Sequence, residues 1–200
     1  NATKYANIFP LIKENKIWLG TKSMGVDMLF DIPKEYADFL VREKKEGSAY
    51  RIVDGVVKGR TQAVWFTNLD HGRRHQPLPL MREAEINKFT KKKSFERYDN
   101  YDAIEVPSVK HIPSDHKGMM GVPISFLDKY NPDQFEIVGL GQGNLYRELT
   151  PRGLSKEFVN NYYKNGGTGS ISEDHPILGY YEDGKATIPY MRIIIKHKKK

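Results

Sequence analysis

The residues best suited to do chemistry in this sequence gather in the stretch VWFTNLDHGRRH, which runs from Val64 to His75. His71 and His75 are four residues apart, the spacing of two metal ligands on one face of a helix. Gly72 and the two arginines that follow it argue against this use, because cations beside the ligands oppose a divalent metal. We therefore expect no metal site here and interpret the histidine-bearing part as a solvated basic loop.

The sequence offers no complete set of residues for the common enzyme mechanisms. Asp70-His71 and Asp115-His116 are adjacent pairs, and neighbouring side chains on a strand point apart. Neither a GxSxG motif for a hydrolase nor a GxxxxGK[ST] phosphate loop is present. The run GLGQGN at 139–144 follows a predicted strand, but its third glycine comes one residue too early for a dinucleotide-binding loop. A flexible connection is the better interpretation of that run.

Aromatic and basic residues combine better than the histidines do. A predicted strand over 61–69 carries Trp65, Phe66 and Asn68 near its end, and Arg73, Arg74 and His75 follow. Aromatic faces stack on nucleobases, which stabilises a complex by about 1–3 kcal/mol per base, and arginine forks fit phosphate or a guanine edge. Alternation along a strand sends Trp65 and Phe66 to opposite faces, so we expect at least one of them to lie in the core.

The elements that must position these residues are short helices and strands in alternation. Asp54-Gly55, between β-branched runs, is the strongest hairpin signal in the chain. The remaining pattern predicts helices over 5–15, with the regular part starting near Pro10, and over 34–45, 83–93 and 123–132, with one weak helix within 155–170. It predicts strands at 16–20, 25–32, 102–109, 134–140 and 188–196, and a long loop over 111–123 with Gly118 and Gly121 as turn points. The predicted fold class is therefore α/β in the broad sense, a mixed α and β (α+β) arrangement.

The composition points to an acidic partner. The 200 residues include 32 Lys and Arg against 25 Asp and Glu, a formal net charge of +7, and nucleic acid is the commonest partner of such a chain. A basic protein with a solvated lysine tail is the plain alternative, and the final KHKKK is interpreted as a disordered tip. The chain has no cysteine, which excludes disulfides and thiolate sites and suits a reducing cytoplasm. It shows neither a membrane-spanning apolar run nor a signal peptide.

Three longer motifs carry a resemblance to a known family. They are NAxxYxxIFPLIKENKIWLG at the start, WFTNLD followed by Arg74-His75, and YDNYDAIEV with IPSDHKGMMGVPISFLDKYNPDQFEIVG. Together they resemble the adenine-specific DNA methyltransferases of the EcoRI type. The resemblance covers most of 1–30 and 61–140 with the final strand, while 31–60 and 141–187 match less well.

The resemblance implies a Rossmann-like methyltransferase fold, S-adenosylmethionine as donor and methylation of adenine N6 in double-stranded DNA after the base is flipped out. It implies that residues 1–80 form the trailing part of the methyltransferase core and 81–200 a target-recognition region, with 141–187 as a divergent insertion. In that frame Trp65, Phe66 and Asn68 are candidates to hold the flipped base. The candidate DNA contacts are Arg73, Arg74 and His75 with a second segment that contains Lys110, His111, Ser114 and Lys117.

The family's catalytic Asn-Pro-Pro-Phe motif is absent, because the sequence has no Pro-Pro pair at all. The first residue is Asn1 rather than methionine, so we expect the chain to begin inside a longer protein or after processing. We expect that this chain alone does not methylate DNA or hold the donor, that its partner is the missing N-terminal half, and that an exposed sheet edge favours self-association in the bacterial cytoplasm. A stand-alone DNA-binding module is the alternative, and a metal-dependent phosphodiesterase using Asp70, His71 and His75 is a remote one.

Overall fold

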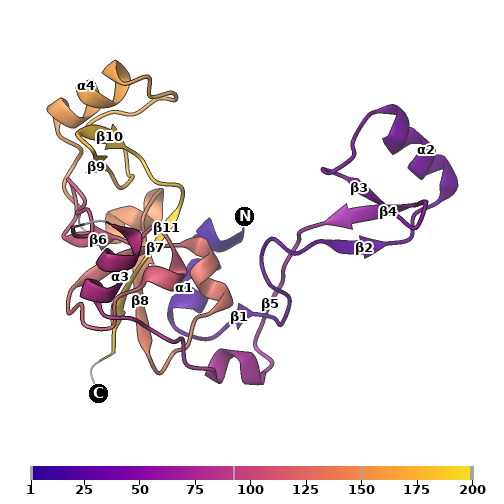
Figure 1. The fold of residues 1–200 in the computed structure, drawn as a ribbon, viewed down its shortest axis with the longest axis horizontal. Helices are drawn as coiled ribbons and strands as arrows, with labels where there is room; N and C mark the ends of the chain where they lie inside the picture. Colours follow the sequence, from indigo (N-terminus) through magenta and orange to yellow (C-terminus); the bar gives the residue numbers. More distant parts are fainter. Residues whose placement is uncertain (1, 92, 150, 199–200) are drawn as a thin grey trace. The chain divides into compact units, whose positions relative to one another are not determined.

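The computed structural model describes residues 2–91, 93–149 and 151–198, and the chain forms two compact units. Unit 1 consists of Asn1–Trp18 with Asn68–Lys200, and unit 2 is Leu19–Thr67. In unit 1 the elements are η1 (Ala2–Lys4), α1 (Phe9–Lys13), η2 (Gly72–His75), α3 (Glu83–Thr90), β6 (Ala103–Glu105), η3 (Val109–His111), β7 (Met119–Pro123), η4 (Ile124–Asp128), β8 (Phe135–Leu140), η5 (Asn144–Leu149), α4 (Lys156–Lys164), β9 (Tyr180–Glu182), β10 (Lys185–Thr187) and β11 (Arg192–His197). Unit 2 contains β2 (Met28–Phe30), α2 (Lys34–Arg42), β3 (Tyr50–Val53), β4 (Val56–Thr61) and β5 (Phe66–Thr67), and β1 (Trp18–Leu19) lies at the boundary (Figure 1).

The centre of unit 1 is a four-stranded sheet in the order β6-β7-β11-β8. β6 and β7 run parallel, whereas β11 is antiparallel to both of its neighbours. The run Ile193–Ile195 is fully buried, as expected for a central strand that is covered on both faces. This sheet fixes the position of the segment between β6 and β7, which carries the candidate residues Lys110, His111, Ser114 and Lys117.

Unit 1 has a tyrosine-rich cluster and, near β8, contacts of α1 and η4. One buried cluster is rich in tyrosine and consists of Tyr98, Tyr101, Ala103, Tyr146, Leu178, Tyr180 and Ile194. Helix α1 packs against β8, and it begins at a proline-containing first turn that needs no donor from Pro10. Phe126 of η4 and Phe135 of β8 meet edge to face with ring centroids 5.3 Å apart. The core of unit 1 is therefore aromatic as well as aliphatic.

The segment between 141 and 187 contains a small helix-on-hairpin layer. Ser155 caps α4 by accepting a hydrogen bond from the Phe158 backbone at 3.0 Å, and Leu154 and Phe158 pack with Ala186 of β10. The hairpin β9–β10 turns at Asp183-Gly184, and both residues have positive φ. No hairpin was predicted here from the sequence, although the dipeptide Asp183-Gly184 is a hairpin signal.

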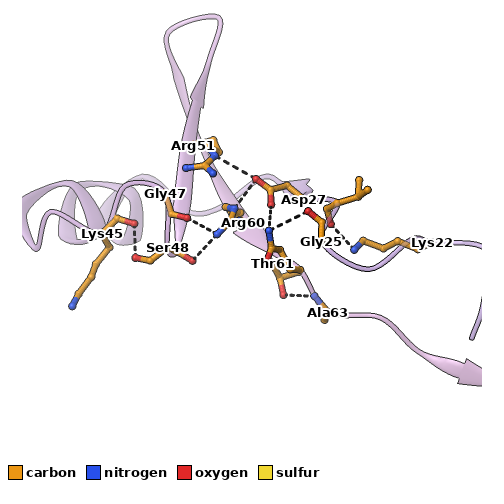
Figure 2. Close-up of polar contacts among 12 residues, drawn as sticks. Lys22, Gly25, Asp27, Lys45, Gly47, Ser48, Arg51, Arg60, Thr61 and Ala63 are labelled. Carbon is orange, nitrogen blue, oxygen red and sulfur yellow. Dashed lines mark hydrogen bonds and ion pairs between the residues drawn. The ribbon is translucent and has the colours of Figure 1, made fainter. Parts of the chain in front are cut away.

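Unit 2 is a three-stranded antiparallel sheet in the order β2-β4-β3 with α2 packed against β4. The predicted hairpin is confirmed, because Val53 pairs with Val56 across Asp54-Gly55. The φ angles of Asp54 and Gly55 are 50° and 77°, as a type I′ turn requires. Figure 2 shows the polar centre of this unit, where Asp27 lies between Arg51 and Arg60 at 3.3 and 2.6 Å.

The predicted mixed α and β class is confirmed. The Rossmann-like sheet stays a prediction, because such a sheet is mostly parallel and, in the described four-stranded sheet, only β6 and β7 run parallel. The prediction of a turn at Gly121 was wrong, because this glycine lies inside β7 under the ring of Tyr98. The strand expected over 61–69 is divided between the end of β4 and the short β5.

The compact units do not follow the functional division expected at 80/81, which stays a prediction together with the role of 141–187. Unit 2 is an insertion within the N-terminal part rather than one half of the chain. In the part of the chain that the structure describes, no helix has the length and apolar character needed to span a membrane.

Candidate nucleic-acid interface

The predicted basic loop is organised around the carboxylate of Asp70. His75 lies with Nε2 at 2.8 and 3.0 Å from the two Asp70 oxygens, and Arg74 Nη1 lies at 3.6 Å. The hydrogen bond from His75 lowers the pKa of Asp70, and the nearby Arg74 guanidinium acts in the same direction. Residues 72–75 form the short helix η2, which holds the side chains of Arg74 and His75 beside the carboxylate.

Arg74 is built into unit 1 rather than extended into solvent. Its guanidinium carbon lies 3.4 Å from the centre of the Trp18 ring, and Nη2 donates to Asn15 Oδ1 at 2.8 Å. Asn15 has φ of 56° and follows Glu14, the C-cap of α1, while Trp18 donates from Nε1 to the Leu69 carbonyl at 3.0 Å. The Arg74 side chain is 11% exposed, so it acts mainly as a positioning residue for the loop.

The other candidate residues of the loop differ in exposure. Arg73 is half-buried, and the His75 side chain is 51% exposed. Asn68 is exposed as well. A loop of this kind presents its cationic and amide groups at the surface while Asp70 and Trp18 hold its backbone.

The two candidate aromatic residues belong to unit 2. Trp65 is 48% exposed, and its indole lies over Gly20, where a side chain would overlap the ring. Phe66, in β5, is half-buried. Trp65 therefore has the more exposed aromatic face, and its ring packs against Gly20.

The second candidate segment is split by the fold. Ser114 and Lys117 line a hollow of about 850 Å³ in unit 1. Lys110 is exposed on η3, and His111 lines a different pocket, with its ring 6.5 Å from that of Phe89. The structure therefore brings Ser114 and Lys117 together and places Lys110 and His111 apart from them.

The hollow is completed by residues at the C-terminal end of β11. Its lining consists of Ser114, Asp115, His116, Lys117, Glu136, Lys196, His197 and Lys198. Lys196 lies in β11, as the predicted strand at 188–196 requires, whereas the interpretation of KHKKK as a disordered tip was wrong for His197, which also belongs to β11; residues 199 and 200 lie outside the described residues. The signal that could have revealed this is the unbroken β-branched run that leads into Lys196.

Pairing inside the hollow leaves its surface cationic. Lys196 lies 3.2 Å from Glu136, and Asp115 Oδ1 accepts a hydrogen bond from the Glu83 backbone at 2.9 Å. Among the described residues, no carboxylate forms an ion pair with Lys117 or Lys198, and both are exposed. Burial lowers the pKa of His116, which favours its neutral form. The two lysines are therefore the groups best placed to meet an anion.

No candidate metal cluster lies in the described ranges. They contain no group of three or more His, Cys, Asp or Glu side chains that could hold a metal ion. Side chains added at Gly139 and Gly141 would overlap Leu149 and Leu178, so the chain itself fills the space beside these glycines. This glycine run does not fit the donor cofactor that the family resemblance implies.

Comparisons with known proteins agree on one family. A family profile described as "Adenine-specific methyltransferase EcoRI" matches residues 1–198. The Type II methyltransferase M.EcoRI of Escherichia coli is 40% identical over 159 residues, which cover 79% of this chain and 46% of the relative. M.MgeORF184P of Mycoplasma genitalium is 36% identical over 68% of this chain and 41% of its own length, and M.MpnI of Mycoplasma pneumoniae is 35% identical over 68% and 40%. The chain thus spans less than half the length of these curated relatives, and no solved structure matches it significantly.

Proposed function

The chain belongs to the EcoRI family of adenine-specific methyltransferases, and from this premise we propose that it supplies DNA binding and target-base recognition to a site-specific adenine-N6 DNA methyltransferase. The enzyme would serve a restriction–modification system in a bacterial cytoplasm, because the relatives are named type II methyltransferases. Its partners in this proposal are double-stranded DNA and an N-terminal methyltransferase half, because the match covers only 46% of M.EcoRI. Its Rossmann-like sheet would be completed by that half.

The cationic hollow of unit 1 is the observation that carries the DNA-binding proposal. Lys117 and Lys198 enter the hollow from different segments and have no carboxylate partner among the described residues. Ser114 adds a hydroxyl that can donate to a phosphate oxygen. Contacts of this kind fix the position of a duplex and depend on the salt concentration, because they release condensed counterions.

We assign the base-proximal contacts to the loop that Asp70 organises. Arg73 and His75 offer donors at the surface, and Arg74 positions them through Trp18 and Asn15. The stacking role on a flipped adenine goes to Trp65, whose ring is more exposed than that of Phe66, and Asn68 is a further polar contact. Lys110 and His111 form a separate, peripheral group in this proposal.

Methyl transfer requires groups that this chain does not contain. S-adenosylmethionine would supply the methyl group in the whole enzyme, but the Asn-Pro-Pro-Phe motif is absent from this chain. The side chains of Leu149 and Leu178 occupy the space beside Gly139 and Gly141, where a cofactor would otherwise lie. The residues described here bind DNA, orient the target strand and hold the flipped base. We therefore expect no methylation by the 200-residue chain alone.

A salt series of DNA binding tests the proposed function. Lys117→Ala with Lys198→Ala should weaken duplex binding and lower the slope of log Kobs against log salt by about 1.8, since each lost phosphate contact contributes about 0.9. Lys4→Ala with Lys13→Ala makes the same change in net charge at exposed positions outside the hollow and should change the slope much less. Fluorescence anisotropy with a labelled duplex measures both.

Equal slopes for the two double variants would contradict the hollow as the DNA-binding surface. A tritiated methyl donor adds a second readout, in which the purified chain alone should transfer no label to duplex DNA. Incorporation of label above the level seen without protein would contradict the proposal that this chain alone does not methylate DNA.

A further inference from the structure

A second, smaller pocket of unit 1 has a chemical character opposite to that of the cationic hollow. Its volume is about 280 Å³, and it lies between α3, the segment 94–96, β6 and β9. Apolar surface dominates the walls, to which Ile86, Phe95 and Pro107 contribute. The polar lining comes from Asn87, Thr90, Ser94, Glu96, Glu105, His111, Tyr180 and Glu182.

Tyr180 gives this pocket a polar group that the fold itself does not use. The residue is 8% exposed, and its hydroxyl has no hydrogen-bond partner among the described residues. Its ring is fixed edge to face against Tyr98, with centroids 6.2 Å apart. Burial and the nearby carboxylates, Glu105 first, raise the pKa of Tyr180 to about 12, so the hydroxyl stays protonated at neutral pH. Because Tyr180 lines the pocket, its hydroxyl can form a hydrogen bond with a bound ligand.

The lining of this pocket is negative in a chain whose net charge is +7. Three of the described lining residues are glutamates, and His111 is their one basic neighbour in the lining. The charge of Glu105 is balanced by Arg192, which donates from Nε at 3.0 and 3.1 Å and from Nη2 at 2.6 Å. Glu96 is half-buried and has neither a side-chain hydrogen bond nor an ion pair with the described residues. The excess negative charge at the pocket therefore includes Glu96.

We propose that this pocket binds a small organic cation, an amidinium or guanidinium group attached to a flat apolar body. The walls bury the apolar body, Glu96 accepts hydrogen bonds from the cation, and the Tyr180 hydroxyl completes the polar end. The faces of Phe95 and Tyr180 are aromatic surfaces that attract cations. A volume of about 280 Å³ fits a single-ring ligand, because drug-sized ligands occupy sites of about 300–1,000 Å³.

Benzamidine is the probe for this site, with neutral benzamide and anionic benzoate as analogues of the same shape. Titration of the 200-residue chain, followed by amide chemical shifts, should show saturable binding of benzamidine that is at least tenfold tighter than that of either analogue. The shifted amides should lie in α3, the segment 94–96, β6 and β9. Saturation at other residues, or equal affinity for benzamide, would overturn the proposal.

Two variants test the assigned groups separately. Tyr180→Phe removes a hydroxyl that bonds to no described residue, so the fold should be preserved, and Glu96→Gln removes one charge. Each should weaken benzamidine binding about fivefold to tenfold, whereas Glu173→Gln, an exposed residue outside the lining, should leave it unchanged. Wild-type affinity in both pocket variants would refute the assignment, and thermal unfolding of each variant confirms that it is folded.

Discussion

At the scale of single residues, the basic loop owes its form to the groups that restrain its cations. Asp70 holds His75 and Arg74, and Trp18 with Asn15 fixes the Arg74 guanidinium from the other side. A guanidinium enclosed in this way loses little freedom when a ligand arrives, because the fold has already ordered it. Arg73 and His75 also lose less freedom on binding, because the backbone that carries them is already held in one conformation.

We predict that Arg74→Ala destabilises unit 1 by about 1–2 kcal/mol, because it removes a cation–π contact and a charge-assisted hydrogen bond. Arg73→Ala, which leaves the contacts of Arg74 with Trp18 and Asn15 intact, should cost less stability. Urea unfolding of both variants measures the difference. The reverse order of stabilities would show that Arg74 is not the positioning residue of the pair.

The sequence identified part of this arrangement. Charge and spacing around His71 and His75 predicted a basic loop, and the loop is observed as η2. The contributions of Asn15 and Trp18 were missed because they lie more than fifty residues away along the chain. Contacts over such separations are set by packing, which leaves no local pattern in the sequence.

At the scale of elements, one glycine lets three strands share a buried charge. Gly121 of β7 lies between Glu105 of β6 and Ile194 of β11. The Tyr98 ring covers that glycine, and its hydroxyl donates to Glu105, the carboxylate that Arg192 of β11 also holds. A buried ion pair is tolerated when further hydrogen bonds satisfy its oxygens, as they do here.

Gly121→Ala should destabilise unit 1 by about 1–3 kcal/mol, because the new methyl group would overlap the Tyr98 ring and displace its hydroxyl from Glu105. Gly72→Ala is the matched control, since a methyl group there meets nothing within 4 Å. Thermal unfolding of the two variants separates packing from the general effect of replacing glycine. Equal melting temperatures would contradict the overlap.

Local signals decided which elements could be predicted. The hairpin at Asp54-Gly55 follows from the φ preferences of two adjacent residues, so the sequence was sufficient to predict it. Strand β7 contains Gly121 and ends at Pro123, both of which read locally as turn residues. It is a strand because β6 and β11 pair with it and Tyr98 fills the space above its glycine.

At the scale of the whole molecule, the chain consists of two compact units with different sources of stability. Unit 1 has the large aromatic and aliphatic core, whereas unit 2 depends in part on the ion pairs of Asp27 with Arg51 and Arg60. The hydrogen bond from Arg60 lowers the pKa of Asp27 from 3.8 to about 2. Acid therefore acts on the two units unequally.

We predict that unit 2 loses stability as the pH falls from about 4 to about 2. The pKa of Asp27 is lower in the folded chain, so its contribution is complete above the unfolded value of 3.8 and disappears as the folded carboxylate is protonated near 2. Trp65 fluorescence in a Trp18→Phe variant reports on unit 2 alone. In an Asp27→Asn variant, the stability of unit 2 should change much less between about pH 4 and about pH 2. If its stability fell with pH as in the wild type, Asp27 would be ruled out as the cause.

The paired strands β1 and β5, here called the neck of unit 2, have a consequence for how such proteins can diversify. The chain enters and leaves the unit through the paired strands β1 and β5, and Gly20 N donates to the Trp65 carbonyl at 3.0 Å. A segment whose two ends are adjacent imposes no change of path on the remainder of the chain, whatever its length. Unit 2 is therefore an exchangeable cassette, one that evolution or an engineer can shorten, enlarge or replace by cutting at the neck.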